Sequence, residues 1–498
     1  MYYIGYDVGS SSVKGALVEC QSGKVMAIAQ KPETEMEMIS LKPGWAEQDP
    51  DHWWQNICSV THALLSKSRI NPAKISGIGI AYQMHGLVVV GSEGVLLRKS
   101  IIWCDGRAVE IGNRALNELG ADRCSTDLLN APGNFTASKL RWLKENEPQL
   151  YSQIYKIMLP GDYIAYKFSG SLCTTIPGLS EGIFWDFSSN KLATSLLDYY
   201  EIDRHLLPDI ADTFSMQGTV SEKASMASGL KKGTPILYRA GDQPNNALSL
   251  NVLDPGEVAT TGGTSGVVYA VTDSLSVKES TRVNNFAHVN HSKEKTRIGK
   301  LLCINGTGIL YRWLLDNLDF TNYEEMNSAA LDVAAGSYGL RIYPFGNGPE
   351  RMLDNKDIGA KIDTLNFNIH SKSHLCRATL EGIAFSFAYG MDIMRRDGVT
   401  PHTIKTGYDN LFRSELFAQM VSTLFGSNIE VYNTTGAVGA ARACLLHKGE
   451  FDTFKAQLSD QDFIKSYRPE PSSSSLFEFY GQWKEGLNNT LKSFKNGI

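Results

Sequence analysis

The chain opens with three short apolar segments that are separated by small and polar residues. Hydrophobic positions fill residues 2–6, 13–18 and 24–29, and the intervening stretches are 9–12 and Ser22-Gly23. Short apolar runs joined by tight turns rich in glycine and serine are typical of antiparallel strands. We therefore predict a meander of three strands, with a glycine- and serine-rich turn at its first hairpin.

A similar pattern returns in the middle of the chain. Apolar Val258-Ala259 is followed by the turn 262–266, by the apolar segment 267–270 and by a third apolar segment near 283–289. Two such units, one at the start of each half of the chain, indicate a diverged internal duplication. We expect two α/β domains, at residues 1–244 and 245–498, with a cleft between them.

Apolar residues spaced three or four positions apart predict the helices that follow each meander. The clearest helix starts at Asp49-Pro50 and ends before an apolar strand at 75–81. Pro469 to Ser475 is expected to be a linker before a terminal amphipathic helix. Other helices are expected at 137–144, 149–158, 162–168, 374–394, 412–425 and 437–447, and another strand at 402–406.

Size and composition agree with two globular domains. The chain has 498 residues, whereas a single hydrophobic core stops growing at about 250 to 300 residues. It is 42% hydrophobic and carries a net charge of -5 without a long basic run. This excludes a mostly disordered chain and gives no electrostatic footprint for nucleic acid or an anionic membrane. Any phosphate that binds is expected to be small.

Cysteine spacing and the start of the chain bear on its compartment. The eight cysteines include no Cys-x-x-Cys pair, so neither a zinc site nor a disulfide framework is expected. The sequence begins directly with a predicted strand, and no stretch approaches 18 uninterrupted apolar residues. We expect a cytoplasmic protein with reduced cysteines.

Asp242 is the candidate general base. Gly241 to Asn246 follow the apolar segment 235–238, and α/β enzymes commonly place reactive side chains where a strand ends. We expect a short glycine-flanked turn there that frees the carboxylate from helix packing. The turns 9–12 and 262–266 can present backbone N–H groups and hydroxyls to phosphate. Taken alone, each turn is more often structural, but together with one acid they suggest phosphoryl transfer.

Other polar residues fit the same chemistry. Asp7 lies between a strand and the first turn and could orient a metal ion beside nucleotide phosphates, whereas Lys14 is equally a solvated residue or a phosphate contact. Gln83 and His85 follow a strand and could reach sugar hydroxyls, although a lone histidine is more often structural. Asp105 and Arg107 form either a buried pair or a substrate contact.

The motifs resemble those of the FGGY carbohydrate kinases within the actin-like ATPase superfamily, and most closely the xylulokinase branch. The resemblance runs through nearly the whole chain and implies two actin-like, ribonuclease H-like domains. It also implies an ATP-dependent kinase that acts on a ketopentose. The motifs are residues 5–14, 44–50, 83–86, 103–107, 135–142, 241–242, 263–266, 377–382 and 439–441.

The resemblance also implies roles for individual residues. Asp242 would be the catalytic base and would share a magnesium ion with Asp7. The nucleotide would be held by two turns and by a segment near the adenine. The implied nucleotide contacts are Gly9, Ser10, Ser11, Ser12, Gly263, Thr264, Ser265, Asp409 and Asn410, and the implied sugar contacts are Met84, His85, Trp103, Asn134, Asp242 and Gln243. Family resemblance further favours a homodimer.

Three departures from the family pattern leave alternatives open. Asp409 to Phe412 stand where a run of glycines is usual, Asn134 is unusual in the first signature, and Gln243 to Asn245 replace Asn-Ala-Ala. The adenine pocket and the fine sugar contacts are thus expected to differ. The alternatives are a kinase for sedoheptulose, L-xylulose, D-ribulose or a polyol, and an actin-like ATPase or sugar sensor without sugar turnover.

Overall fold

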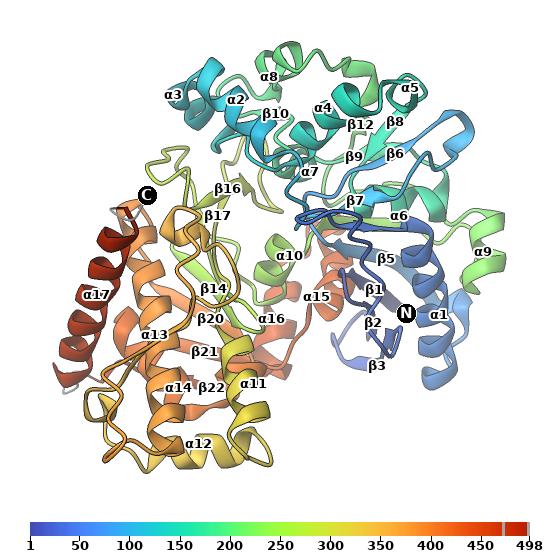
Figure 1. Ribbon diagram of the computed structural model, residues 1–498. Coiled ribbons are helices and arrows are strands. Elements are labelled where there is room, and N and C mark those ends of the chain that lie inside the picture. Colours follow the sequence, from blue (N-terminus) through green and yellow to red (C-terminus); the bar gives the residue numbers. More distant parts are fainter. Residues whose placement is uncertain (471–473, 496–498) are drawn as a thin grey trace.

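The protein folds into two lobes, each built on a twisted mixed sheet with helices on its faces (Figure 1). The structure is a computed structural model that describes residues 1–470 and 474–495, without the side chains of Asn410, Ser459, Asp460 and Lys495. The predicted linker at 469–475 therefore falls partly outside the described residues. None of the helices in the described ranges is long and apolar enough to cross a bilayer.

The first sheet has the strand order β13-β5-β1-β2-β3. β1 and β2 and then β2 and β3 pair antiparallel, so the predicted meander is confirmed, and β5 and β13 extend the sheet in parallel. The bounds are β1 (Tyr2–Val8), β2 (Val13–Glu19), β3 (Val25–Lys31), β5 (Ile75–Tyr82) and β13 (Ile236–Gly241).

The second sheet has the order β16-β17-β15-β14-β20-β21-β22. β17, β15 and β14 pair antiparallel, and β20 and β21 continue in parallel, which repeats the pattern of the first sheet. The bounds are β14 (Glu257–Gly262), β15 (Gly266–Thr272), β16 (Asn284–Ala287), β17 (Ile298–Ile304), β20 (Thr403–Gly407), β21 (Ile429–Tyr432) and β22 (Phe463–Tyr467).

One strand of the second meander was placed wrongly by the sequence pattern. The apolar segment near 283–289 does contain β16, but β16 pairs with β17 at the edge of the sheet and does not touch β15. The third strand of the meander is β17, whose residues pair with β15 along its whole length. The longer and more completely buried run of β17 takes the central position because it fills the core on both faces.

The helix expected at 149–158 is also wrong. Helix α5 (Pro148–Tyr151) ends after one turn, and β8 (Lys156–Met158) pairs antiparallel with β6 (Val88–Val90). The apolar residues of this segment satisfy both a helical and an extended pattern, and the strand partner decides between them.

Helices cover both sheets. α1 (Pro50–Ser68) starts at the Asp49 cap, as predicted, and buries Trp53, Ile57 and Leu64 against the first sheet. The remaining helices of this lobe and its upper part are α2 (Val109–Leu119), α3 (Ala121–Arg123), α4 (Thr136–Asn146), α6 (Pro160–Ser169), α7 (Ile176–Glu181), α8 (Thr194–Tyr199) and α9 (Glu222–Ser228). Its short strands are β4 (Glu47–Gln48), β7 (Ser100–Ile101), β9 (Cys173–Thr174), β10 (Trp185–Asp186), β11 (Lys191–Leu192) and β12 (Asp209–Ile210).

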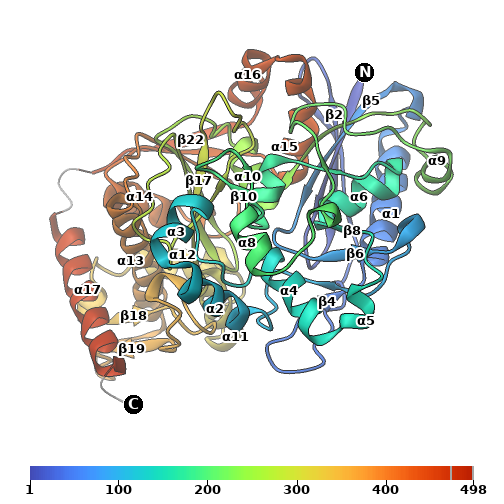
Figure 2. The same cartoon turned by 90° about the horizontal axis from the view of Figure 1, so that it is seen from above.

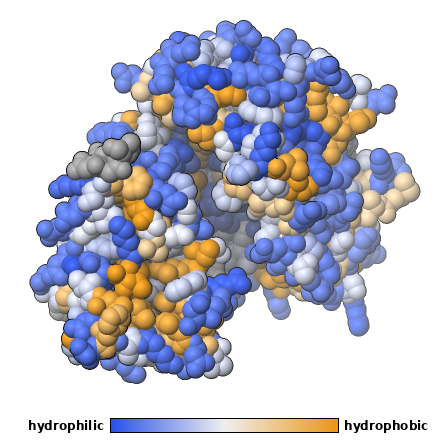
Figure 3. Space-filling view, viewed as in Figure 1, coloured by the Kyte–Doolittle hydropathy of each residue, from blue (hydrophilic) through white to orange (hydrophobic). Residues whose placement is uncertain are grey.

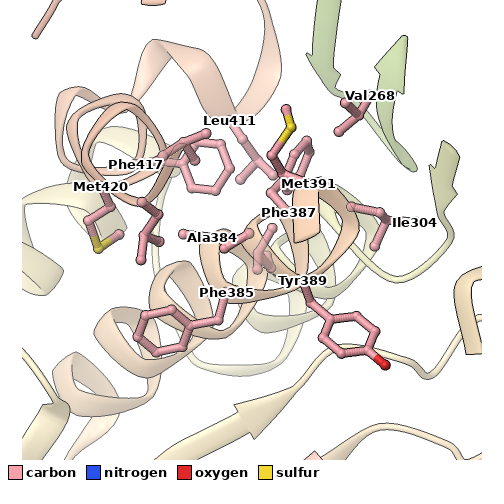
Figure 4. Close-up of a cluster of buried hydrophobic side chains, with 14 of the residues drawn as sticks. Val268, Ile304, Ala384, Phe385, Phe387, Tyr389, Met391, Leu411, Phe417 and Met420 are labelled. Atoms are coloured by element: carbon pink, nitrogen blue, oxygen red, sulfur yellow. The ribbon is translucent and has the colours of Figure 1, made fainter. Parts of the chain in front are cut away.

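The long helix α13 (Lys372–Arg396) forms the centre of the second lobe. Phe387 and Met391 project from it toward the sheet and toward α14 (Glu415–Phe425), as Figure 4 shows. Phe385 points away from the sheet, and its ring lies 5.8 Å from that of Tyr480. Most residues of α13 are buried, which explains why its sequence has no continuous polar face. The other elements of this lobe are α11 (Gly308–Asn317), α12 (Tyr323–Leu331), β18 (Arg341–Tyr343), β19 (Lys361–Asp363), α16 (Phe451–Gln461) and α17 (Ser474–Lys495).

Two helices lie between the lobes. α10 (Asp242–Ser249) packs against α15 (Gly436–Ala443), and α15 packs on β1, β2, β5 and β13 of the first sheet (Figure 2). The second half of the chain thus supplies a helix to the first sheet. The expected helix 437–447 is this α-helix followed by a 3-10 segment at Cys444–Lys448.

Candidate active site between the lobes

Asp242 lies where β13 ends and α10 begins, and α10 lies between the two lobes (Figure 1). The space-filling view shows a hollow between the lobes (Figure 3). The expected glycine-flanked turn is absent, because α10 starts at Asp242 itself. The Gln243 N–H donates to Asp242 Oδ1 over 2.9 Å, and Gln243 Nε2 lies 3.4 Å from Asp242 Oδ2. The carboxyl is therefore oriented by its own helix start.

Asp7, at the end of β1, is close enough for its charge to affect the pKa of Asp242. Burial and then the charge of Asp7 raise the pKa of Asp242 to about 7, and burial raises the pKa of Asp7 against the effect of Lys14. A Cβ atom on Gly436 would stand 2.7 Å from Asp7 Oδ2 and 2.9 Å from Asn246 Oδ1. The glycine that starts α15 is thus needed for these oxygens to converge.

This oxygen cluster fits a divalent cation that is shared with a substrate. No described Lys or Arg side chain forms an ion pair with Asp7 or Asp242, although the charge of Lys14 favours the ionised form of Asp7. The described residues contain no group of three or more His, Cys, Asp or Glu that could hold a metal alone. Magnesium typically takes one or two protein carboxylates and completes its shell with water and phosphate.

The first turn, 9–12, is held from behind by its carbonyl groups. Gln48 Nε2 donates to the Ser10 carbonyl over 2.6 Å, and the Met36 N–H donates to the Ser11 carbonyl over 2.8 Å. The N–H groups and hydroxyls of Ser10, Ser11 and Ser12 meet no acceptor in the described parts of the chain. Within this turn, the Gly9 N–H donates to the Ser12 carbonyl over 3.1 Å.

The second turn, 263–265, is built in the same way. The N–H groups of Gly308 and Ile309, at the start of α11, donate to the carbonyls of Gly263 and Thr264 over 3.0 and 3.1 Å. Within the described chain, the N–H groups of Gly263, Thr264 and Ser265 have no acceptor. Both turns therefore present unpaired donors, which is the arrangement that binds phosphate.

His85 follows β5 and lies in the left-handed backbone region with φ 62°. Its Nδ1 lies 2.9 Å from the Glu181 carbonyl oxygen, so Nδ1 carries the proton and donates it. Burial and the nearby Lys139 ammonium lower the pKa of His85 to about 3. The ring is therefore neutral, and Nε2 is left as a hydrogen-bond acceptor.

Met84 connects this segment to the strand end that precedes Asp242. A Cβ atom on Gly241, the residue before Asp242, would stand 2.5 Å from Met84 Cγ and 2.5 Å from Glu181 Oε2. Met84, Glu181 and the start of α10 therefore share one wall. Of the predicted sugar contacts, the structure brings Met84, His85, Asp242 and Gln243 together here.

The two-part match to known protein families decides what this chain is. Residues 2–249 match the N-terminal domain, and residues 258–446 the C-terminal domain, of the FGGY family of carbohydrate kinases. The chain belongs to the FGGY family of carbohydrate kinases. Kinases of this family use ATP as a substrate, which suits the two turns with free donors.

Relatives of this FGGY kinase are similar over nearly their whole length. It is 27% identical to the xylulose kinase of Escherichia coli (strain K12) over 88% of both chains. It is 25% identical to the xylulose kinase of Bacillus subtilis (strain 168) over 99% of both. It is 27% identical to the L-xylulose/3-keto-L-gulonate kinase of E. coli K12, over 99% of this chain and 98% of that protein.

Solved structures have the same fold as this FGGY kinase. Ligand-bound xylulose kinase from Lactobacillus acidophilus superimposes with a TM-score of 0.89 at 23% identity, over the full length of both chains. Xylulose kinase from Rhodospirillum rubrum gives a TM-score of 0.87, also at 23% identity, over 99% of both. The expected pair of actin-like, ribonuclease H-like domains is confirmed.

The loop 103–107 is held in place by contacts among its own residues and with Trp45. Asp105 and Arg107 form a buried ion pair of 2.7 Å, and the Arg107 guanidinium stacks 3.8 Å from the centre of the Trp45 ring. Asn134 Nδ2 donates to the Asp105 carbonyl, which directs this amide into the loop. Trp103 is 52% exposed at the surface of the same loop. Their contact with sugar stays a prediction.

The segment 409–412, expected to lie near the adenine, packs against the residue before the second turn. Leu411 Cβ and the Phe412 ring stand 3.0 and 3.3 Å from the position of a Cβ on Gly262. Burial raises the pKa of Asp409, and the first opposing charge is that of Lys14 in the other lobe. The charge of Lys14, in the first lobe, therefore favours the ionised form of Asp409. The side chain of Asn410 lies outside the described residues.

Sequence reasoning missed two residues that contact His85. Lys139 Nζ donates to the His85 and Ile102 carbonyls over 2.9 and 3.0 Å, which fixes the left-handed segment. Its place in the signature 135–142 was the available signal. Glu181 lies far from any recognised motif, and only the fold brings it to His85 and Asp242.

Proposed function

We propose that this FGGY kinase transfers the γ-phosphoryl group of ATP to the terminal hydroxyl of a ketopentose, with D-xylulose as the acceptor and D-xylulose 5-phosphate as the product. The observation that carries the proposal is the convergence of Asp242, two turns with unpaired donors and a neutral His85 at one hollow. The similarity to the xylulose kinases of Escherichia coli and Bacillus subtilis supports the choice of sugar.

In this proposal Asp242 accepts the proton of the sugar hydroxyl as that oxygen attacks the γ-phosphorus in line. The raised pKa suits a group that must take a proton near neutral pH. Gln243, whose two nitrogens contact the carboxyl, keeps it turned toward the acceptor. Phosphoryl transfer depends on positioning and charge neutralisation more than on covalent chemistry.

Phosphate binding is assigned to the two turns. Gly9, Ser10, Ser11 and Ser12 would hold one part of the triphosphate, and Gly263, Thr264 and Ser265 the other. Mg2+, when bound by Asp7 and Asp242, would neutralise phosphate charge. Asp409 and Asn410 are proposed to line the adenine side, with the domain boundary at residues 244 and 245.

Sugar binding is assigned to the wall that precedes Asp242. Met84 would supply an apolar contact and His85 Nε2 would accept a hydrogen bond from a sugar hydroxyl. Trp103 and Asn134 are proposed to border the sugar from the loop 103–107. A homodimer is proposed from family resemblance alone.

The test is a coupled ADP assay with D-xylulose, L-xylulose, D-ribulose, sedoheptulose and glycerol. The native protein is compared with D242N and with the control D209N, which changes an exposed acid on β12. D-xylulose should give the highest kcat/KM, and D242N should lower kcat about 100- to 10,000-fold. A protein that binds ATP but phosphorylates no sugar would instead be an actin-like ATPase or a sensor.

A further inference from the structure

Glu181 ends helix α7 and is only 2% exposed, yet it carries an unpaired oxygen beside the catalytic acid. Its backbone carbonyl accepts from His85 Nδ1, and its Oε1 accepts the His85 N–H over 3.3 Å. Both contacts concern His85. They use the main chain and one carboxyl oxygen of Glu181, and they leave the other oxygen, Oε2, without a role.

Oε2 of Glu181 points to the wall that binds the sugar in the proposed function. It lies 2.5 Å from the position of a Cβ on Gly241, as does Met84 Cγ. No described residue hydrogen-bonds to Oε2, and Oε2 is not one of the fully buried side-chain atoms that lack a partner. A polar atom in such a place destabilises the folded protein unless a ligand or water forms a hydrogen bond with it.

Arg239 and Lys139 make contacts with groups other than Glu181. Arg239 Nε pairs with Asp162 over 3.0 Å, and Lys139 Nζ donates to two backbone carbonyls. Glu181 itself forms no ion pair in the described chain. A structural salt bridge therefore does not explain the carboxyl group.

We propose that Glu181 is a specificity-determining residue that binds, through Oε2, the acceptor hydroxyl next to the one that is phosphorylated. This inference rests on the proposed function. The reacting hydroxyl must lie against Asp242, and Gly241 joins Asp242 to the wall at Oε2. The neighbouring hydroxyl of a polyol is the polar group that this geometry brings to Oε2, at C4 when C5 of a ketopentose is phosphorylated.

A positioning role through His85 is the competing explanation. Removing the carboxyl would then disturb His85 and weaken every sugar by the same factor. A direct contact predicts a loss that depends on the C4 hydroxyl alone. The two explanations are separated by a cycle that crosses E181A with the 4-deoxy and 3-deoxy analogues of D-xylulose.

The experiment measures Kd by calorimetry and kcat/KM by the coupled assay for each pair. In the native protein, loss of the C4 hydroxyl should weaken binding about tenfold to hundredfold. In E181A, D-xylulose and its 4-deoxy analogue should bind within about threefold of each other, whereas the 3-deoxy analogue should stay weakened as in the native protein. E181Q keeps both an acceptor and a donor and should restore most of the discrimination.

S180A is the matched control, because Ser180 precedes Glu181 and its Oγ accepts the buried Ala287 N–H over 2.9 Å. It should change all analogues equally. Equal losses for all analogues in E181A, with native thermal unfolding and ATP affinity, would overturn the inference. Discrimination in Kd without turnover would uphold Glu181 and reject the kinase proposal, and absence of any sugar binding would reject both.

Discussion

Gly79 on β5 lies so close to Ala440 on α15 that an added Cβ atom would stand 1.9 Å from the Ala440 carbonyl oxygen. Gly5 on β1 meets the same helix, 2.1 Å from the Ala437 carbonyl oxygen. These contacts involve backbone, which cannot rotate away as a side chain can. The first sheet therefore accepts α15 only because two adjacent strands present glycine.

We expect G79A to destabilise the protein by about 1–3 kcal/mol, since overpacking forces a backbone shift. It should also lower kcat, because α15 begins at Gly436 beside Asp7. Urea unfolding measures the first effect. G481A is the control, since nothing lies within 4 Å of a Cβ on this helical glycine. A G79A protein as stable as G481A would contradict the packing argument.

Binding of a divalent cation should release protons near neutral pH. Burial and the Asp7 charge raise the pKa of Asp242 to about 7, so part of the population carries a proton there. A cation favours the ionised carboxylate and displaces that proton. Calorimetric titration with MgCl2 and ATP at pH 6.5, in buffers of different ionisation enthalpy, measures the number released. D242N should release fewer protons, and an unchanged number would assign them to another group.

The turn 9–12, which we propose to bind phosphate, should depend on its hydrogen bond from Gln48. Q48A removes the donor to the Ser10 carbonyl, and about 1 kcal/mol of lost ordering should raise KM for ATP about fivefold. KM for the sugar should stay unchanged. Q153A, which removes an exposed contact within a surface turn, is the control. Equal increases in both KM values would indicate a general loss of structure.

Acid should destabilise the protein through His288. This ring is fully buried between the Tyr269 hydroxyl and the Val252 carbonyl, and burial lowers its pKa from 6.5 to about 3. The unfolded chain therefore takes up a proton first as the pH falls. The stabilisation is complete above pH 6.5 and is lost between pH 6.5 and 3.

Between pH 7 and 5, His288 should contribute about 1–2 kcal/mol of the decrease in unfolding free energy. H288Q should be less stable at pH 7 but should show a smaller decrease on acidification. Urea unfolding at the two pH values checks this. The exposed His62 supplies the control H62Q, which should leave the pH dependence as in the native protein. An equal decrease in native protein and H288Q would exclude this histidine.

Local patterns predicted the elements whose partners are near in sequence. The first meander, α1 and α13 follow from alternation, capping and helical spacing. The exchange of β16 for β17, and the strand β8 in place of a helix end, depend on which distant segment is available to pair. Periodicity holds no information about that choice.

The candidate site shows the same division. Asp242 and both turns stand out because each follows an apolar strand. Glu181 does not, because it ends a short helix and becomes notable only when the fold places it between His85 and Gly241. The free N–H groups of the turns likewise depend on Gln48 and Gly308, which are distant in the chain.

The packing of α15 on the first sheet joins segments that are synthesised at different times. A ribosome makes β1, β5 and β13 long before it makes α15, so the nascent first lobe exposes the glycine surface that this helix later covers. That lobe cannot complete its core while the chain is still being extended. A fragment cut between the lobes would keep all strands of the first sheet but leave the same surface open, and α15 would cover it again only if the two halves associated.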